Sequence, residues 1–259
     1  MPRPVWRLIV DGPVDGALNM AIDRTLLAGR ADGTAPPTLR LYRWRRPTVT
    51  LGRFQPESQV DLAACGRRGF DVARRPTGGR GVLHDDELTY GVTAAVEDGV
   101  PRGVTPSYRH LCAALARAYQ LLGVAAELTA RPRGERGAGA CYLHATTADL
   151  SLGAAKLSGS AQVWKDDAVL QHGSFVISRD AVAESEVFRL GASQAVALRE
   201  GTATLADVLD AIPSPEEVAD AVRTSFAEVL GIDLEPGWLT EEEARRAASL
   251  EPEHAISTL

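Results

Sequence analysis

Residues 74–90 read RRPTGGRGVLHDDELTY, and this stretch does most to decide how the chain folds. Two arginines lead into a turn that holds three glycines, a His-Asp-Asp-Glu cluster follows, and a β-prone run ends the segment. Glycine has no Cβ, so the backbone N–H groups of such a turn can approach an anion or an acyl group closely. Taken alone, the turn equally fits a glycine-rich loop that joins two strands.

A second segment rich in small residues lies further along, where residues 156–162 read KLSGSAQ and residues 172–174 read HGS. Together the two segments resemble the biotin/lipoate protein ligase and acyltransferase superfamily. In that superfamily an RRxTGG-type loop and a K-(I/L)-(S/A/T)-G-(S/A)-A-Q segment line one acyl-binding tunnel. Residues 16–23 look like its opening helix, and residues 39–42 with 47–55 look like its first hairpin. The resemblance therefore covers about residues 5–180, in order.

One branch of this superfamily, the cysteine-dependent octanoyltransferases of the LipM type, is the most similar. That branch carries an A-C-(F/Y) segment 15 residues before the lysine, and Ala140-Cys141-Tyr142 and Lys156 match this spacing. Its glycine loop reads RRPTGGR-(A/G)-V-L-H-(D/E)-x-E-L-T-Y, which residues 74–90 fit almost residue by residue. Residues 229–232 and 237–240 also look like the ending of that branch.

The resemblance implies a two-step transfer. Cys141 attacks the thioester of octanoyl-acyl carrier protein and becomes an octanoyl-enzyme. A lysine of a lipoyl domain or of the glycine-cleavage H protein then takes the octanoyl group as an amide. The thioester already carries the activation energy, so no cofactor and no metal are expected. ATP and magnesium would be needed only by the ligase alternative considered below.

Residue chemistry supports a pairing of Cys141 with Lys156. A free thiol has a pKa near about 8.5, and a neighbouring ammonium group favours the thiolate. Cys141 lies between the glycine- and arginine-rich residues 131–139 and a predicted strand, and a hairpin could bring its side chain to Lys156. The pair would then form a nucleophile in which Lys156 lowers the thiol pKa and helps to deprotonate the incoming amine. A buried structural cysteine is the commoner case, so both interpretations stay open.

Several other residues are candidates for binding the substrate. Arg74 or Arg75 either meets the phosphopantetheine of the donor or positions the loop, and His84 either assists proton transfer or hydrogen-bonds the loop beside Asp85. His172 either walls the pocket or is structural. The complete predicted set is Arg74, Arg75, Thr77, Gly78, Gly79, Arg80, His84, Gly159, Ser160, Ala161, His172 and Gly173.

Composition is that of an ordinary globular protein of 259 residues, with 45% hydrophobic and 24% charged residues. We expect a single catalytic domain over residues 1–259, with its core at about 5–180 and a helical part at about 181–259. The apolar runs are too short for a membrane span, and the N-terminus lacks the pattern of a signal peptide. Three cysteines without CxxC spacing favour a reducing cytoplasm.

Charge points to an acidic protein partner. The net charge of −6 argues against binding of nucleic acid, and membrane binding is not expected. Arginines are nevertheless concentrated in one part of the chain, where they could attract an acyl carrier protein or a lipoyl domain, both acidic in general. A merely solvated arginine-rich face is the alternative. The concentrated residues are Arg40, Arg43, Arg45, Arg46, Arg53, Arg67, Arg68, Arg74, Arg75 and Arg80.

Periodicity predicts an α+β fold of mixed and antiparallel sheets with flanking helices and a short helical C-terminal tail. Helices are expected at residues 15–29, 61–68, from 105 to 122, from 215 to 230 and from 241 onward, the last two opened by capping boxes. Strands are expected at 5–10, 39–44, 49–51, 70–75, 88–96, 148–152, 157–164 and 169–177, the last three as successive antiparallel strands.

Three rival functions remain. An ATP-dependent lipoate–protein ligase of the same fold would tend to show a third glycine and a Gly-Asn ending in the loop, where this chain has Arg80 and Glu87-Leu88. The short tail after residue 180 also counts against a ligase with an accessory domain. A relay amidotransferase, which moves octanoyl from H protein to lipoyl domains, would share Cys141 and Lys156. A non-enzymatic acyl-binding protein would not need them.

Overall fold

The computed structural model describes residues 2–129 and 149–258. Its largest sheet has six strands in the order β10-β11-β6-β2-β1-β12. β2, β6, β11 and β10 are antiparallel neighbours, whereas β1 runs parallel to both β2 and β12. These strands are β1 (Val5–Val14), β2 (Thr38–Trp44), β6 (Glu87–Ala95), β10 (Ser160–Lys165), β11 (Ala168–Val176) and β12 (Asp233–Pro236).

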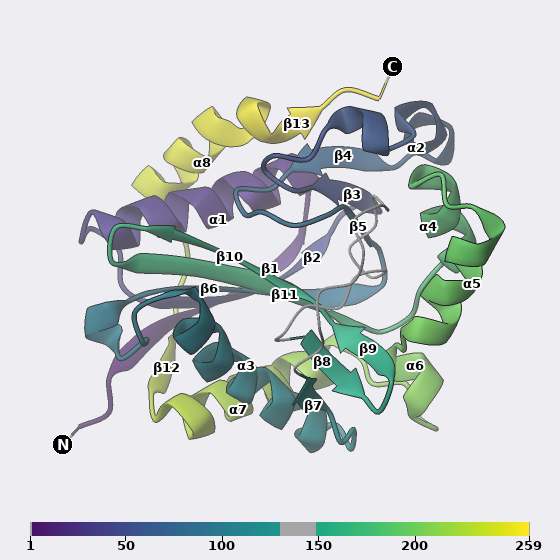
Figure 1. The fold of residues 1–259 in the computed structure, drawn as a ribbon. Helices are drawn as coiled ribbons and strands as arrows, with labels where there is room; N and C mark the ends of the chain where they lie inside the picture. The colour runs from purple at the N-terminus through teal and green to yellow at the C-terminus, as the bar shows by residue number, and fades with distance from the viewer. Residues whose placement is uncertain (1, 130–148, 259) are drawn as a thin grey trace.

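Two smaller sheets lie at one end of the large sheet (Figure 1). One has the order β13-β4-β3-β5 and carries the strands on either side of the glycine turn. The other has the order β7-β8-β9 and carries Lys156. Their strands are β3 (Thr48–Leu51), β4 (Asp71–Arg74), β5 (Val82–His84), β13 (Ala255–Ile256), β7 (Glu127–Thr129), β8 (Asp149–Leu152) and β9 (Ala155–Ser158).

Helices cover both faces of the large sheet (Figure 1). α1 (Gly16–Ala31) packs on β6 and β11 with α8 (Glu241–His254) beside it, while α3 (Val104–Leu121) and α7 (Pro215–Leu230) pack against the other face. The arrangement confirms the predicted α+β fold with flanking helices. No helix among the described residues is long and apolar enough to cross a membrane. The short helices are α2 (Leu62–Arg68), α4 (Ala181–Val187), α5 (Ala192–Gly201), α6 (Leu205–Val208), η1 (Glu57–Gln59) and η2 (Val96–Asp98).

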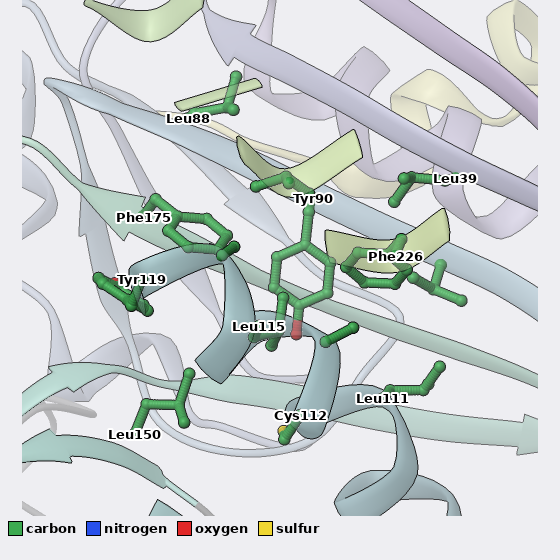
Figure 2. Packing of buried hydrophobic residues seen from close by; sticks show 14 of the residues in the cluster. Leu39, Leu88, Tyr90, Leu111, Cys112, Leu115, Tyr119, Leu150, Phe175 and Phe226 are labelled. Carbon is green, nitrogen blue, oxygen red and sulfur yellow. The ribbon is translucent and has the colours of Figure 1, made fainter. Parts of the chain in front are cut away.

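The main core lies between the large sheet and the α3–α7 pair (Figure 2). Tyr90 of β6 is fully buried there between the rings of Phe175 and Phe226, with 6.3 Å between centroids in both pairs. Tyr119 of α3 packs on Phe175 at 4.7 Å. Aromatic pairs at such separations add to the free energy gained by burial alone. The core therefore holds β6 and β11 in place, and both strands contribute residues to the candidate site.

The sequence prediction of successive strands fails at Gly159. The predicted strand over residues 157–164 is two strands, β9 in the small sheet and β10 in the large one. The backbone changes sheets at Gly159 because its carbonyl lies against Gly173, where a Cβ would be only 2.5 Å from that oxygen. Glycine is therefore needed at position 173 for the close approach of the two backbones.

Two further details differ from prediction. The expected first hairpin is wrong, since β2 and β3 belong to different sheets. The helix expected from residue 105 begins one residue earlier, because α3 starts at Val104 after Gly103. β2 is buried almost throughout, because helices and strands cover both its faces. The C-terminal part is mainly helical as predicted, and it adds β12 and β13 to the edges of two sheets.

The arginine concentration is not a bare basic surface. Arg40 is fully buried and pairs with Asp11 and Asp23, and Arg75 is also buried. Exposed members such as Arg68 pair with surface carboxylates, here Glu186. The expectation of a solvated arginine face is therefore wrong for the two buried residues, since charges that leave water need a partner.

Candidate active site

A cavity with an empty volume of about 680 Å³, open solvent included, lies where the glycine turn meets the large sheet and the β8–β9 hairpin. Its walls come from α1, β2, β3, β6, β10 and β11 as well as from the turn. Predicted site residues that line it are Arg75, Gly79, His84, Lys156, Gly159, Ser160, Ala161, His172 and Gly173. Lining residues outside the predicted set are Met20, Tyr42, Trp44, Thr50, Val82, Thr89, Asp149 and Ser174.

The other predicted binding residues lie around the turn without lining the cavity. Thr77 is fully buried behind the turn. Gly78 and Arg80 face a separate depression on its outer side. Arg74 extends its guanidinium away from the cavity, donating to the Gln55 carbonyl at 2.7 Å and pairing with Glu57 at 3.1 Å.

Arg75 holds the glycine turn in shape. Its Nη2 donates to the carbonyls of Gly78 at 2.8 Å and Arg80 at 2.7 Å. Gly79 has a φ of +95°, which a residue with a Cβ rarely adopts, and a Cβ there would lie 2.7 Å from the Arg75 guanidinium. Of the two roles predicted for the arginines, positioning the loop is the one for which the structure shows contacts.

Gly52 is the residue against which the turn packs. A Cβ at Gly52 would lie 2.1 Å from the carbonyl oxygen of Gly79, so Gly52→Ala must push the turn away from β3. We expect a loss of about 1–3 kcal/mol in the free energy of unfolding and a slower acyl transfer, because overpacked sites relax only partly. Urea unfolding and a transfer assay would measure both. Gly12→Ala, with no atom within 4 Å of its Cβ, is the matched control and should change neither.

A buried chain of hydrogen bonds fixes the other side of the turn. His172 Nδ1 lies 2.8 Å from Asp23 Oδ2, and His172 Nε2 lies 2.7 Å from Thr77 Oγ1. Asp23 also accepts from Arg40 Nη1 at 3.0 Å and from the Tyr42 hydroxyl at 3.0 Å. α1, β2, β11 and the turn therefore share one network beneath the cavity.

Charges in this network set its proton positions. Burial alone would raise the pKa of Asp23, but the hydrogen bond from His172 and the charge of Arg40 outweigh burial and lower the pKa. Burial lowers the pKa of His172, although Asp23 opposes it. The carboxylate can only accept, so the neutral ring donates from Nδ1. Nε2 therefore accepts the hydroxyl hydrogen of Thr77.

Thr77→Val tests this chain of bonds. Valine keeps the volume of threonine but leaves His172 Nε2 without its donor, and an unsatisfied buried group costs about 1–3 kcal/mol. We expect kcat/KM for octanoyl transfer to fall about 5- to 10-fold, the kinetic equivalent of about 1–1.4 kcal/mol. Thr77→Ser, which keeps the hydroxyl, should retain nearly full activity. Full activity in Thr77→Val together with a loss in Thr77→Ser would mean that the methyl group matters and not the bond.

His84 belongs to a second network on the opposite wall. Its Nδ1 lies 2.7 Å from Glu87 Oε1, its Nε2 lies 2.9 Å from Thr50 Oγ1, and its ring stacks on Trp44 at 4.2 Å. Glu87 also accepts from Ser174 at 2.6 Å. Burial alone would raise the pKa of Glu87. The charge of His84 and its hydrogen bond to Glu87 outweigh burial and lower the pKa. Of the two roles predicted for His84, hydrogen bonding is the one for which the structure shows contacts, and proton transfer stays a prediction.

Lys156 sits in the cavity wall as one half of a buried ion pair. Its Nζ lies 3.0 Å from Asp149 Oδ2, and both side chains are at most 3% exposed. The strands β8 and β9 bring the two residues together, with Lys156 opposite Ser151 in the register. A buried ammonium group needs such a partner. The β8–β9 hairpin places Lys156 in the cavity wall, whereas the predicted approach of Cys141 lies outside the described residues.

Two of the three cysteines are poor nucleophiles. Cys65 is buried in the small core beside β3, and burial raises the pKa of its thiol to about 11. Cys112 is buried on α3, and burial raises its pKa to about 12. At neutral pH both stay protonated, so neither fits the role of an attacking thiolate. Cys141, with residues 131–139, lies outside the described residues.

Some site residues that sequence reasoning missed had a local signal. Asp149 lies before the turn between the two predicted strands, and Lys156 lies after it. The sequence therefore indicates an acid and a lysine on facing strands of one hairpin. No local signal pointed to Asp23, because an acidic residue on an amphipathic helix normally faces water. Its contact with His172 spans 149 positions of sequence.

The comparison with protein families identifies the class to which this fold and cavity belong. Residues 15–227 match the model of the lipoyl protein ligase A/B catalytic domain. Octanoyltransferase LipM of Kyrpidia tusciae is 38% identical, over 95% of this chain and 94% of that protein. LipM of Symbiobacterium thermophilum is also 38% identical, over 95% and 93%. The chain belongs to the lipoyl protein ligase A/B family, and the prediction of an octanoyltransferase enzyme is confirmed.

Solved structures agree on the fold. A lipoate-protein ligase A bound with ATP superposes with a TM-score of 0.80 at 26% identity, over 98% of this chain and 95% of that one. A bipartite lipoate protein ligase of Thermoplasma acidophilum gives 0.77 at 27%, over 98% and 93%. Because these ligase chains are about as long as this chain, the short C-terminal part does not argue against a ligase.

Proposed function

We propose that the chain transfers an octanoyl group from octanoyl-acyl carrier protein to a lysine of a lipoyl domain or H protein, through a thioester on Cys141. The observation that carries the proposal is the cavity itself, in which the glycine turn, Lys156 and the small residues of β10 and β11 face one another. LipM relatives at up to 38% identity support octanoyl as the group transferred.

In the first step, the Cys141 thiolate attacks the carbonyl carbon of the donor thioester. A new carbon–sulfur bond forms, the bond to the carrier sulfur breaks, and the carrier leaves as a thiol after taking up a proton. Lys156 is the cation that favours the Cys141 thiolate. The raised thiol pKa values of Cys65 and Cys112 favour Cys141 by elimination.

In the second step, the acceptor lysine amine attacks the octanoyl-enzyme. An amide bond forms, the proton of the amine is released, and Cys141 is regenerated as the leaving thiolate. The Lys156–Asp149 pair is the ionisable group at the cavity wall through which that proton can leave. The donor thioester supplies the free energy, so the reaction needs neither ATP nor magnesium.

Three donor mixtures test the proposal against its rivals. With a lipoyl domain as acceptor, octanoyl-acyl carrier protein alone should give octanoylated domain. Octanoic acid with ATP and magnesium should not, and activity only in that mixture would establish a ligase. Octanoylated H protein as the donor tests the relay reaction, and faster transfer from it than from the carrier would replace the proposal. The lipoyl domain and H protein should then be compared as acceptors.

A further inference from the structure

A second hollow, with an empty volume of about 1300 Å³ including open solvent, adjoins the acyl cavity and is strongly cationic. We call it the basic groove. Glu253 supplies the one carboxylate that lines it among residues 2–129 and 149–258. The chain as a whole has a net charge of −6, so the local charge of the groove is opposite in sign to the net charge. Its cationic residues are Arg24, Arg53, Arg74, Arg75, Lys165 and Arg246.

Local carboxylates do not balance these cations. Three of these cations pair with a carboxylate: Arg24 with Glu253 at 2.6 Å, Lys165 with Asp32 at 2.8 Å and Arg74 with Glu57 at 3.1 Å. Arg53 and Arg246 are exposed and lie within 4 Å of no carboxylate in the described ranges, and the charge of Arg246 acts at longer range on Asp32, whose pKa is lowered mainly by its hydrogen bond from Lys165. The groove therefore has an excess of positive charge that attracts an anion. Salt screens this attraction only partly at distances shorter than the Debye length.

The walls of the acyl cavity continue into the groove. Along α1, Met20 lines the cavity and Arg24 lines the groove one turn later, on the same helix face. Along β10, Ala161 lines the cavity and Lys165 lines the groove on the same strand face. Arg75 lines both hollows. A single elongated ligand can therefore occupy the two together.

Charge identifies which substrate suits this path. The acceptor arrives with a lysine side chain, and like charges in a groove of cations repel it. The donor carries its acyl chain on a pantetheine arm, and the other end of that arm is a phosphate ester. One molecule therefore combines an apolar tail with an anion. Lys165 lies four residues along β10 from Ala161, about 13 Å, which an extended pantetheine arm can span.

We propose that the basic groove binds the phosphate of the donor's pantetheine arm, with Arg53 and Arg246 as the cations that it meets. The inference rests on the proposed function, since it assigns the donor side of the same site. The acceptor protein then binds to a different face of the chain. The groove is a determinant of donor affinity and leaves the chemistry at Cys141 unchanged.

Charge reversal tests the assignment with a matched control on the same helix. Arg246→Glu and Arg53→Glu change the groove, whereas Arg245→Glu reverses an exposed neighbour that pairs only loosely with Glu241 at 3.7 Å. Rates of enzyme octanoylation are measured with octanoyl-pantetheine, octanoyl-4′-phosphopantetheine and octanoyl-acyl carrier protein. Binding of 4′-phosphopantetheine without an acyl chain is measured separately by calorimetry, which requires no catalysis.

The groove variants should raise KM for both phosphate-bearing donors about 5- to 20-fold at low salt, with kcat and the rate with octanoyl-pantetheine unchanged. Arg245→Glu should match the parent chain throughout. Equal losses with octanoyl-pantetheine, or losses only with the intact carrier protein, would overturn the assignment. So would tighter binding of ATP than of 4′-phosphopantetheine in the groove. Calorimetry keeps the outcome separate from failure of the proposed function, since binding lost in Arg246→Glu supports the groove even if no acyl-enzyme forms.

Discussion

Cys141→Ala should abolish the acyl-enzyme and lower octanoyl transfer by about 10³-fold or more, because removal of a nucleophile removes the whole covalent route. Transfer from octanoyl-acyl carrier protein to a lipoyl domain is the assay. Thermal unfolding of the variant and of the parent chain, measured alongside, separates loss of the nucleophile from loss of the fold.

Cys65→Ala and Cys112→Ala serve as the matched controls. Both thiols are buried and have raised pKa values, so each variant should keep its transfer activity apart from modest losses of stability. Full activity in Cys141→Ala, or its loss in Cys112→Ala with the fold intact, would contradict the assignment of the nucleophile.

Lys156→Ala should give the second largest effect, a loss of about 10²-fold or more in transfer, the range found when a proton-transfer group is removed. The variant also leaves Asp149 as a buried carboxylate without its 3.0 Å partner. Breaking one side of a buried ion pair costs about 3–5 kcal/mol, so stability must be measured alongside activity.

The double variant Lys156→Ala/Asp149→Ala separates the two effects. With both charges gone, the free energy of unfolding should recover, whereas the transfer rate should stay low. The rate of Cys141 alkylation against pH gives an independent readout, with a midpoint that rises by about one pKa unit in Lys156→Ala. Recovery of transfer in the double variant would mean that Lys156 serves stability only.

Local signals were enough to predict much of this molecule. The capping boxes at Ser214 and Thr240, the helix that Gly69 ends, and the strand before the glycine turn all depend on neighbouring residues, and each is where the sequence places it. Residues of both short motifs line one cavity, and their role in binding an acyl group stays a prediction.

Contacts between distant segments were beyond such reasoning. Nothing near Gly159 shows that the chain changes sheets there, since the reason is the approach of Gly173 from another strand. Arg40 looks like a surface arginine until Asp11 and Asp23 are seen beside it. The partners of His84 and His172 likewise come from folding, so residue type alone left their roles open.

Intact mass measurement of the enzyme after incubation with octanoyl-acyl carrier protein, without ATP or magnesium, tests the central claim most directly. We expect one octanoyl adduct that hydroxylamine removes and that is missing in Cys141→Ala. An enzyme that stays unmodified, yet octanoylates a lipoyl domain once octanoic acid, ATP and magnesium are supplied, would contradict it.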